Sequence, residues 1–285
     1  MMGGSRSSAR FDAELLTGAR FRRGRVAAIF AHAALVECAD GELLTLVHPS
    51  RELVPLGVVV PWDIVPAGGQ EVVLEGRVLR LADTAVVLDG EGIGLRLPAK
   101  LWPPSRGALR DQLQALSLPP RTQAILGGPI GDLDTVVATE VDVLRVGIAR
   151  LARALCEKLE VEAAVRALVG LGPGATPSGD DLVVGAAAAT LRLRGFLAPD
   201  AADSLQAVLR LVPTSSTTRV SRAMLGHAAR GSFPEPLVRL AAHLGAADVD
   251  LTADALLLAD LGAQTGCDML AGVVAVAEAA LERSA

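Results

Sequence analysis

Short apolar runs separated by turn signals dominate the chain from Val26 to Leu97. Runs such as "ELLTLVH", "EVVLEG" and "TAVVLDG" are rich in branched apolar residues and alternate with "ADG", "AGG" and "DGEG". Strands this short, joined by glycine-containing turns, are typical of antiparallel β-structure. We therefore expect an antiparallel β sandwich or small barrel in the first part of the chain.

The hydrophobic period changes after the proline-rich stretches "LWPPSRG" and "LSLPPR". In "EVDVLRVGIARLARALCEKLE" apolar residues recur three and four positions apart, the stripe of an amphipathic helix. We place the boundary near Trp102, with a β-rich domain over 1–102 and an α-helical domain over 103–285, so the expected fold class is α+β. Further helices are predicted at 162–169, 181–194, 201–211, 219–229, 236–244, 254–260 and 267–282.

Composition and charge limit the partners of the protein. Aromatic residues make up only 2% of the chain, and the formal net charge is −5. Because base stacking and attraction to a polyanion are both disfavoured, we expect no nucleic-acid partner. No segment reaches the roughly 20 apolar residues that span a bilayer, and the start lacks a secretory signal. We therefore expect no membrane partner and a cytoplasmic location.

Cysteine and histidine give no sign of a metal centre. The three cysteines are far apart, and the four histidines lack HExxH spacing. The sequence therefore predicts neither a disulfide framework nor a zinc site, and it requires no cofactor.

The densest chemical signal is the stretch "GLGPGATPSGDDLVVGAAAAT", which begins at Gly170. Gly172 and Gly174 allow backbone angles that other residues avoid. Thr176 followed by Pro177 is the pattern of an N-cap and a first helical residue. We therefore expect a helix to begin at Pro177.

The start of that helix is a candidate anion site. The amides of Ser178 and Gly179 would point out of the N-terminus, where backbone donors and the helix dipole favour a small anion. Asp180 and Asp181 have two readings: they neutralise the dipole, or they are catalytic groups in a ligand pocket. We treat both as candidate catalytic residues, because two adjacent carboxylates exceed what a cap requires.

A second stretch repeats this pattern near the end of the chain. In "TGCDMLAG" the hydroxyl, glycine, aspartate and closing glycine hold the same relative positions as in "SGDDLVVG". Thr265 and Asp268 then share one helix face. We expect the two helices to cross near Gly185 and Gly272, which would bring Asp181 and Asp268 to one pocket. Thr265 and Gly266 join Gly172, Gly174, Thr176, Ser178 and Gly179 as candidate substrate-binding residues.

An arginine-bearing helix lies between the two motifs. In "TSSTTRVSRAMLGHAARG" hydroxyl residues supply caps, and Arg219 stands at the first turn. Arg219 is the candidate to bind a carboxylate or phosphate, because its guanidinium can donate to two oxygens at once. Arg222 and His227 on the same helix are weaker candidates.

The two motifs resemble a known family. "GLGPGATPSGDD" is similar to the signature loop of the AllH-like family, formerly a domain of unknown function and one subunit of the bacterial oxamate carbamoyltransferase of anaerobic allantoin use. "LGAQTGCDMLAGV" resembles the C-terminal motif of the family, and "LWPPS" its midpoint. The sequence departs from the family pattern at Ala175 and Cys267, where larger side chains are expected.

The resemblance implies a transferase subunit that works with other carbamoyltransferase subunits on a small anionic substrate. The reaction would join oxamate and carbamoyl phosphate to oxalurate and phosphate, or run in reverse. It needs an anion site, donors for an oxyanion, and a base or acceptor for a weakly nucleophilic nitrogen. Asp181 or Asp268 would take the last role, although two carboxylates in one pocket raise a pKa. A bridging Mg²⁺ would resolve that conflict, and the sequence neither requires nor excludes it.

A second hypothesis is a non-catalytic scaffold or regulatory subunit that binds a small anion at the same loop, with the chemistry done on another chain.

Overall fold

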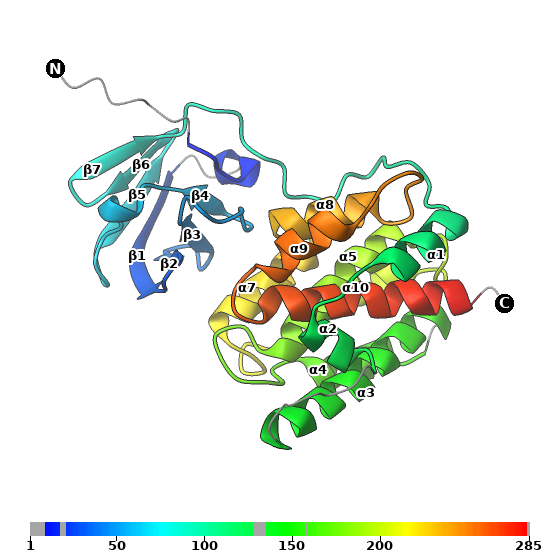
Figure 1. The fold of residues 1–285 in the computed structure, drawn as a ribbon. Helices are drawn as coiled ribbons and strands as arrows, with labels where there is room; N and C mark the ends of the chain where they lie inside the picture. Colours follow the sequence, from blue (N-terminus) through cyan, green and yellow to red (C-terminus); the bar gives the residue numbers. More distant parts are fainter. Residues whose placement is uncertain (1–8, 18–20, 128–134, 158, 284–285) are drawn as a thin grey trace. The chain divides into compact units, whose positions relative to one another are not determined.

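The computed structural model describes residues 9–17, 21–127, 135–157 and 159–283. The chain divides into two compact units, Met1–Leu95 and Arg96–Ala285. The first holds the strands and the second the helices, which confirms the α+β class (Figure 1). We expected the change near Trp102, and the division in the structure falls between Leu95 and Arg96.

The first unit is one curled sheet of seven strands. The strand order is β4-β3-β2-β1-β5-β6-β7, and β3 and β4 pair in parallel while the other neighbours are antiparallel. The sheet is therefore mixed, because β4 returns beside β3 after a connection too long for a hairpin. The strands are β1 (Phe21–Ile29), β2 (Ala33–Cys38), β3 (Leu43–Val47), β4 (Gly57–Val59), β5 (Glu71–Glu75), β6 (Val78–Leu81) and β7 (Thr84–Val87).

The sheet unit has a hydrophobic core of its own. Phe11, Leu46, Val58 and Leu79 are fully buried in it, together with apolar residues from β1, β2 and β5. Asp12 is also buried, and its carboxylate accepts from the Glu14 and Leu56 amides. It therefore ties loops together, which is the structural role of many buried carboxylates.

The second unit is a helical bundle. The helices predicted from 162 onward each lie within about one turn of a helix in the structure. The helices are α1 (Arg106–Ala115), α2 (Pro120–Ile125), α3 (Thr135–Glu157), α4 (Val161–Leu168), α5 (Ser178–Arg192), α6 (Ala201–Arg210), α7 (Arg219–Ala228), α8 (Glu235–His243), α9 (Thr252–Ala259) and α10 (Thr265–Glu282).

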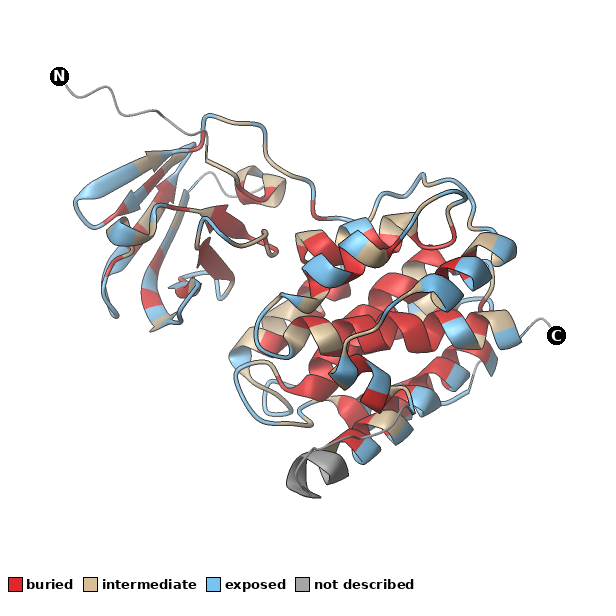
Figure 2. Ribbon diagram, viewed as in Figure 1, coloured by how far each residue is buried: buried red, intermediate tan, exposed pale blue. Residues whose placement is uncertain are grey.

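Two helices, α5 and α10, form the centre of the bundle. Almost every residue of α5 is buried, and α10 is buried through most of its length (Figure 2). A helix that is apolar on all sides must be surrounded by other helices. The alanines of "VVGAAAAT" explain this position, because small side chains let neighbouring backbones approach α5 closely.

Candidate functional site

The central helices α5 and α10 cross at a pair of glycines. A Cβ on Gly185 would lie 1.9 Å from the Met269 carbonyl oxygen, and one on Gly272 would lie 2.1 Å from the Leu182 carbonyl oxygen. Neither position can carry a side chain, so the backbones are in direct contact. The crossing predicted from the spacing of the two motifs is therefore confirmed.

Gly179 and Gly266, near the helix starts, also pack directly against neighbouring backbone. The Gly179 amide donates to the Leu171 carbonyl and the Gly266 amide donates to the Leu261 carbonyl, both at 2.8 Å. Because these amides already have partners, neither can bind an anion. Among the described residues, the amide of Ser178 has no partner, so it is the donor left at the start of α5.

The structure corrects the predicted cap of α5. The helix begins at Ser178, and its N-cap is Pro177, which has extended backbone angles and no side chain to cap with. The amides of Asp180 and Asp181 donate instead to the Pro177 carbonyl. Thr176 lies too early to cap the helix.

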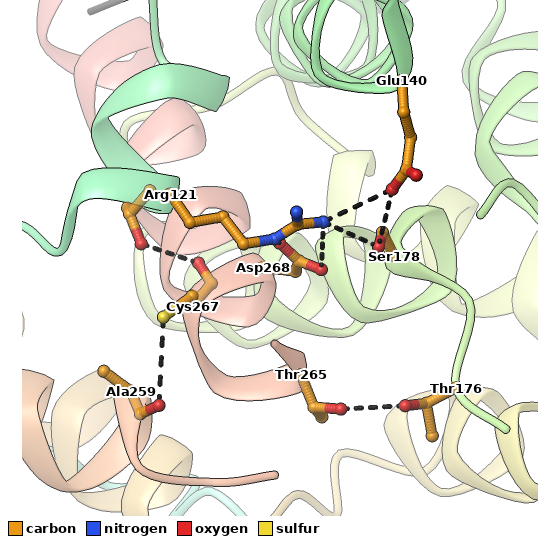
Figure 3. Close-up of polar contacts among 9 residues, drawn as sticks. Arg121, Glu140, Thr176, Ser178, Ala259, Thr265, Cys267 and Asp268 are labelled. Carbon is orange, nitrogen blue, oxygen red and sulfur yellow. Dashed lines mark hydrogen bonds and ion pairs between the residues drawn. The ribbon is translucent and has the colours of Figure 1, made fainter. Parts of the chain in front are cut away.

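Thr176 contacts α10 instead. Its hydroxyl lies 2.8 Å from that of Thr265, which connects the glycine loop to the start of the second motif helix (Figure 3). The two hydroxyls are also hydrogen-bond neighbours of the Asp181 carboxyl. Three of the predicted site residues therefore meet in one place.

An arginine that the sequence analysis missed lies between the two helix starts. Arg121 of α2 donates from Nε to Asp268 Oδ1 at 2.6 Å and from Nη2 to Asp268 Oδ2 at 3.1 Å. Nη2 also donates to Ser178 Oγ at 2.9 Å, and it lies 3.5 Å from Glu140 of α3 (Figure 3). The side chain of Arg121 thus lies at the helix starts, where we expected a pocket shared by Asp181 and Asp268.

The guanidinium of Arg121 is only partly used by these contacts. Among the described residues, Nη1 has no hydrogen-bond partner, and the side chain is 15% exposed. Asp268 is 1% exposed. Asp268 therefore holds the arginine from the inside, and Nη1 remains for another group.

The pKa values of the two motif aspartates are shifted by different surroundings. Burial raises the pKa of Asp268, and the hydrogen bonds and charge of Arg121 oppose that shift. Burial also raises the pKa of Asp181 well above its ordinary value, and the negative charge of Asp268 raises it further. Within the part of the chain that the structure describes, no cation opposes the shift at Asp181. The rise in pKa expected for two carboxyls in one pocket is therefore stronger at this residue.

Asp180 has a different place. Its Oδ1 accepts from the Gly170 amide at 2.9 Å, and its Oδ2 accepts from the Thr217 hydroxyl. Burial raises the pKa of Asp180, whereas these two bonds lower it. Both oxygens therefore fasten the glycine loop and the segment before α7 to α5, which is a structural role.

The remaining loop glycines shape the turn. Gly172 and Gly174 have φ of 109° and 95°, which favours glycine. A Cβ on Gly172 would lie 3.0 Å from the Ser178 nitrogen, while Gly174 faces open space. Gly172 thus leaves room beside the Ser178 amide.

Arg219 begins α7, as the sequence predicted, and its role in binding an anion stays a prediction. It is exposed in the first turn of α7, and the arginine in contact with the motif residues is Arg121. Arg222 bonds the Thr214 carbonyl at 3.4 Å, and His227 is buried with its Nδ1 at 2.9 Å from Arg230. Arg222 and His227 therefore make contacts within the helical unit.

Two further observations concern metals and membranes. Within the described ranges, no three His, Cys, Asp or Glu side chains are grouped as a metal site. In the same ranges, every helix is too short or too polar to cross a lipid bilayer.

Comparison with known proteins gives one family. Residues 168–277 match the model of the family described as oxamate carbamoyltransferase subunit AllH. This match confirms the resemblance of the two motifs and includes both Asp181 and Asp268. Arg121 and Glu140 lie outside the matched range. Neither a curated protein nor a solved structure matches the chain.

Proposed function

We propose, from the match of residues 168–277 to a family of oxamate carbamoyltransferase subunits, that this chain is the subunit that binds a small anion for carbamoyl transfer. The site lies at the adjoining starts of α5 and α10. The reaction would be the exchange between oxamate with carbamoyl phosphate and oxalurate with phosphate. We expect it to take place in the cytoplasm, with other subunits of the transferase.

The observation that carries the proposal is the orientation of Arg121. Asp268 binds Nε and Nη2 and leaves Nη1 to donate to a carboxylate or phosphate oxygen. The unpartnered Ser178 amide lies at the same helix start, where the dipole of α5 favours negative charge. Oxamate, oxalurate and both phosphates carry such oxygens.

The carboxylates then have separate tasks. Asp268 positions Arg121, and because both its oxygens are bound by the guanidinium it is not a base. Asp180 fastens the loop. Asp181 is left as the carboxyl that can act on the ligand.

The test is a calorimetric titration of the full chain with oxamate, phosphate and carbamoyl phosphate, with and without Mg²⁺. Arg121→Lys keeps a positive charge beside Asp268 but loses Nη1, so we expect anion binding at least 10-fold weaker, as for one lost charged hydrogen bond. Arg166→Lys is the matched control, because Arg166 is an exposed arginine of α4 paired with Glu162, and this variant should bind as the wild type does. Equal binding by wild type and Arg121→Lys would refute the site. Anion binding that requires Mg²⁺ would support an ion that bridges Asp181 and Asp268.

A non-catalytic anion-binding subunit remains the second candidate, and one observation favours it. Asp181 and Asp268 are each 1% exposed, so the carboxyls are enclosed in this state of the protein. Asp181→Ala in the reconstituted transferase separates the two functions. Loss of turnover with anion binding intact supports a catalytic subunit, whereas unchanged turnover supports a binding subunit.

A further inference from the structure

The two motif helices each place a hydroxyl near a carboxyl of the other helix. Ser178 at the start of α5 is a hydrogen-bond neighbour of Asp268 on α10, and Thr265 at the start of α10 is one of Asp181 on α5. The first hydroxyl of each helix therefore lies near the carboxyl of the other. The arrangement is a local two-fold repeat built from the equivalent positions of the two motifs.

The repeat is broken at the carboxyls. Asp268 has a cation, since Arg121 binds both its oxygens. Asp181 has only the hydroxyls of Thr176 and Thr265 beside it, and its Oδ2 is buried without any hydrogen-bond partner in the described part of the chain. The charged groups that act on Asp181 are the carboxyls of Asp268 and Asp180, and both raise its pKa. Arg121 is bound to Asp268 and Glu140.

Ionising a buried carboxyl in such surroundings costs free energy. An ionised oxygen without a donor loses its hydration and gains nothing in return, and the negative charge of Asp268 adds repulsion. A neutral carboxyl avoids both costs. Its one remaining demand is an acceptor for the hydroxyl hydrogen, and the protein supplies none at Oδ2.

We propose that Asp181 is a neutral acid whose Oδ2 donates a hydrogen bond to a carbonyl or anionic oxygen of the bound ligand. The inference rests on the proposed function, and it makes Asp181 a donor for the developing oxyanion in place of a base. No proton leaves the residue in this role. Because Asp181 is 1% exposed, this role requires the contact between Thr176 and Thr265 to open when the ligand binds.

The first arm of the test needs no ligand. The infrared spectrum of the wild-type chain should contain the carbonyl stretch of a protonated carboxyl, and Asp181→Asn should remove it. Asp254→Asn is the control, because Asp254 is a buried carboxylate paired with Arg239 and His243. A band that is absent at neutral pH overturns the proposal whatever the protein binds.

Stability gives a second ligand-free measure. The folded state binds the Asp181 proton more tightly than the unfolded chain, whose Asp pKa is about 3.9. The free energy of unfolding of the wild type should therefore fall as pH rises above about 4 until the folded pKa is passed. Asp181→Asn should show a smaller fall, because the raised pKa values of Asp180, Asp268 and Glu278 still contribute to it. An identical pH profile for both proteins contradicts a neutral Asp181.

The last arm compares two substitutions in the reconstituted transferase. An Asn amide can donate a hydrogen bond but cannot act as a base, and an Ala side chain can do neither. We expect Asp181→Asn to retain turnover within about 10-fold and Asp181→Ala to lose about 100-fold, as for one oxyanion donor. Loss of turnover in Asp181→Asn, with the fold intact, would show a base and refute the donor role. If the wild type binds no anion, the proposed function fails while the infrared result stands by itself.

Discussion

The ion pair of Arg121 and Asp268 makes the stability of the helical unit sensitive to a single residue. Asp268 is almost fully buried, so removing its cation leaves a buried charge without compensation. We expect Arg121→Ala to lower the free energy of unfolding by about 3 kcal/mol. Urea denaturation followed by circular dichroism measures this loss.

A double variant provides the control for that measurement. In Arg121→Ala with Asp268→Asn the uncompensated charge is absent, so the loss should be smaller than the sum of the two single losses by about 1–3 kcal/mol. Strictly additive losses would mean that the pair contributes little. Exposed Arg219→Ala should change stability by no more than about 0.5 kcal/mol.

Sequence reasoning found the two carboxyls but not the cation, for a physical reason. Asp181 and Asp268 stand in motifs whose spacing alone fixes their helix faces. Arg121 follows two prolines in a helix of six residues, and its partner is 147 positions away. No local pattern encodes a pairing that exists only once α2 packs beside α10. Arg219 was chosen because it stood beside a cap, which is a local signal.

At the scale of elements, glycine spacing predicted the helix crossing because the requirement is local to each helix. One glycine on each contact face suffices to define where two backbones meet. The start of α5 was predicted one residue early, since Thr-Pro is a frequent cap pattern. The rigid geometry of Pro177 and the contact of Thr176 with Thr265 decided the outcome.

The crossing makes a prediction about opposite effects of the same substitution. Gly185→Ala would force a Cβ against the Met269 carbonyl, so we expect a loss of about 3 kcal/mol or more in the free energy of unfolding. Gly107→Ala, on the exposed face of α1, meets only a serine hydroxyl at 3.7 Å. It should raise stability by about 0.5–1 kcal/mol, because Ala has the higher helix propensity.

Thermal unfolding of the two variants checks this pair of signs. A stable Gly185→Ala protein with an unchanged melting temperature would show that α5 and α10 can separate without cost. That result would also remove the geometric basis for placing Asp181 beside Asp268.

At the scale of the whole molecule, the sheet and the bundle each have a separate hydrophobic core. The Ala, Val and Leu that fill the bundle come from its own helices and connecting loops, and α5 and α10 are buried by other helices of the same unit. All residues of the proposed site, from Arg121 to Asp268, also lie within Arg96–Ala285. The helical unit therefore contains a hydrophobic core of its own and all the residues of the proposed site.

We accordingly predict that a chain of residues 96–285 folds alone. It should unfold in one cooperative transition. It should also bind the same anion as the full chain with an affinity within about 10-fold, and the bound anion should raise its apparent stability by mass action. Calorimetry of the fragment with and without oxamate or phosphate measures both properties. A fragment that folds but binds nothing, when the full chain binds, would place an essential ligand contact in the sheet unit. A fragment that does not fold would show that the bundle needs the sheet for stability, and the full chain would then be the smallest unit in which the site of Arg121 can be studied.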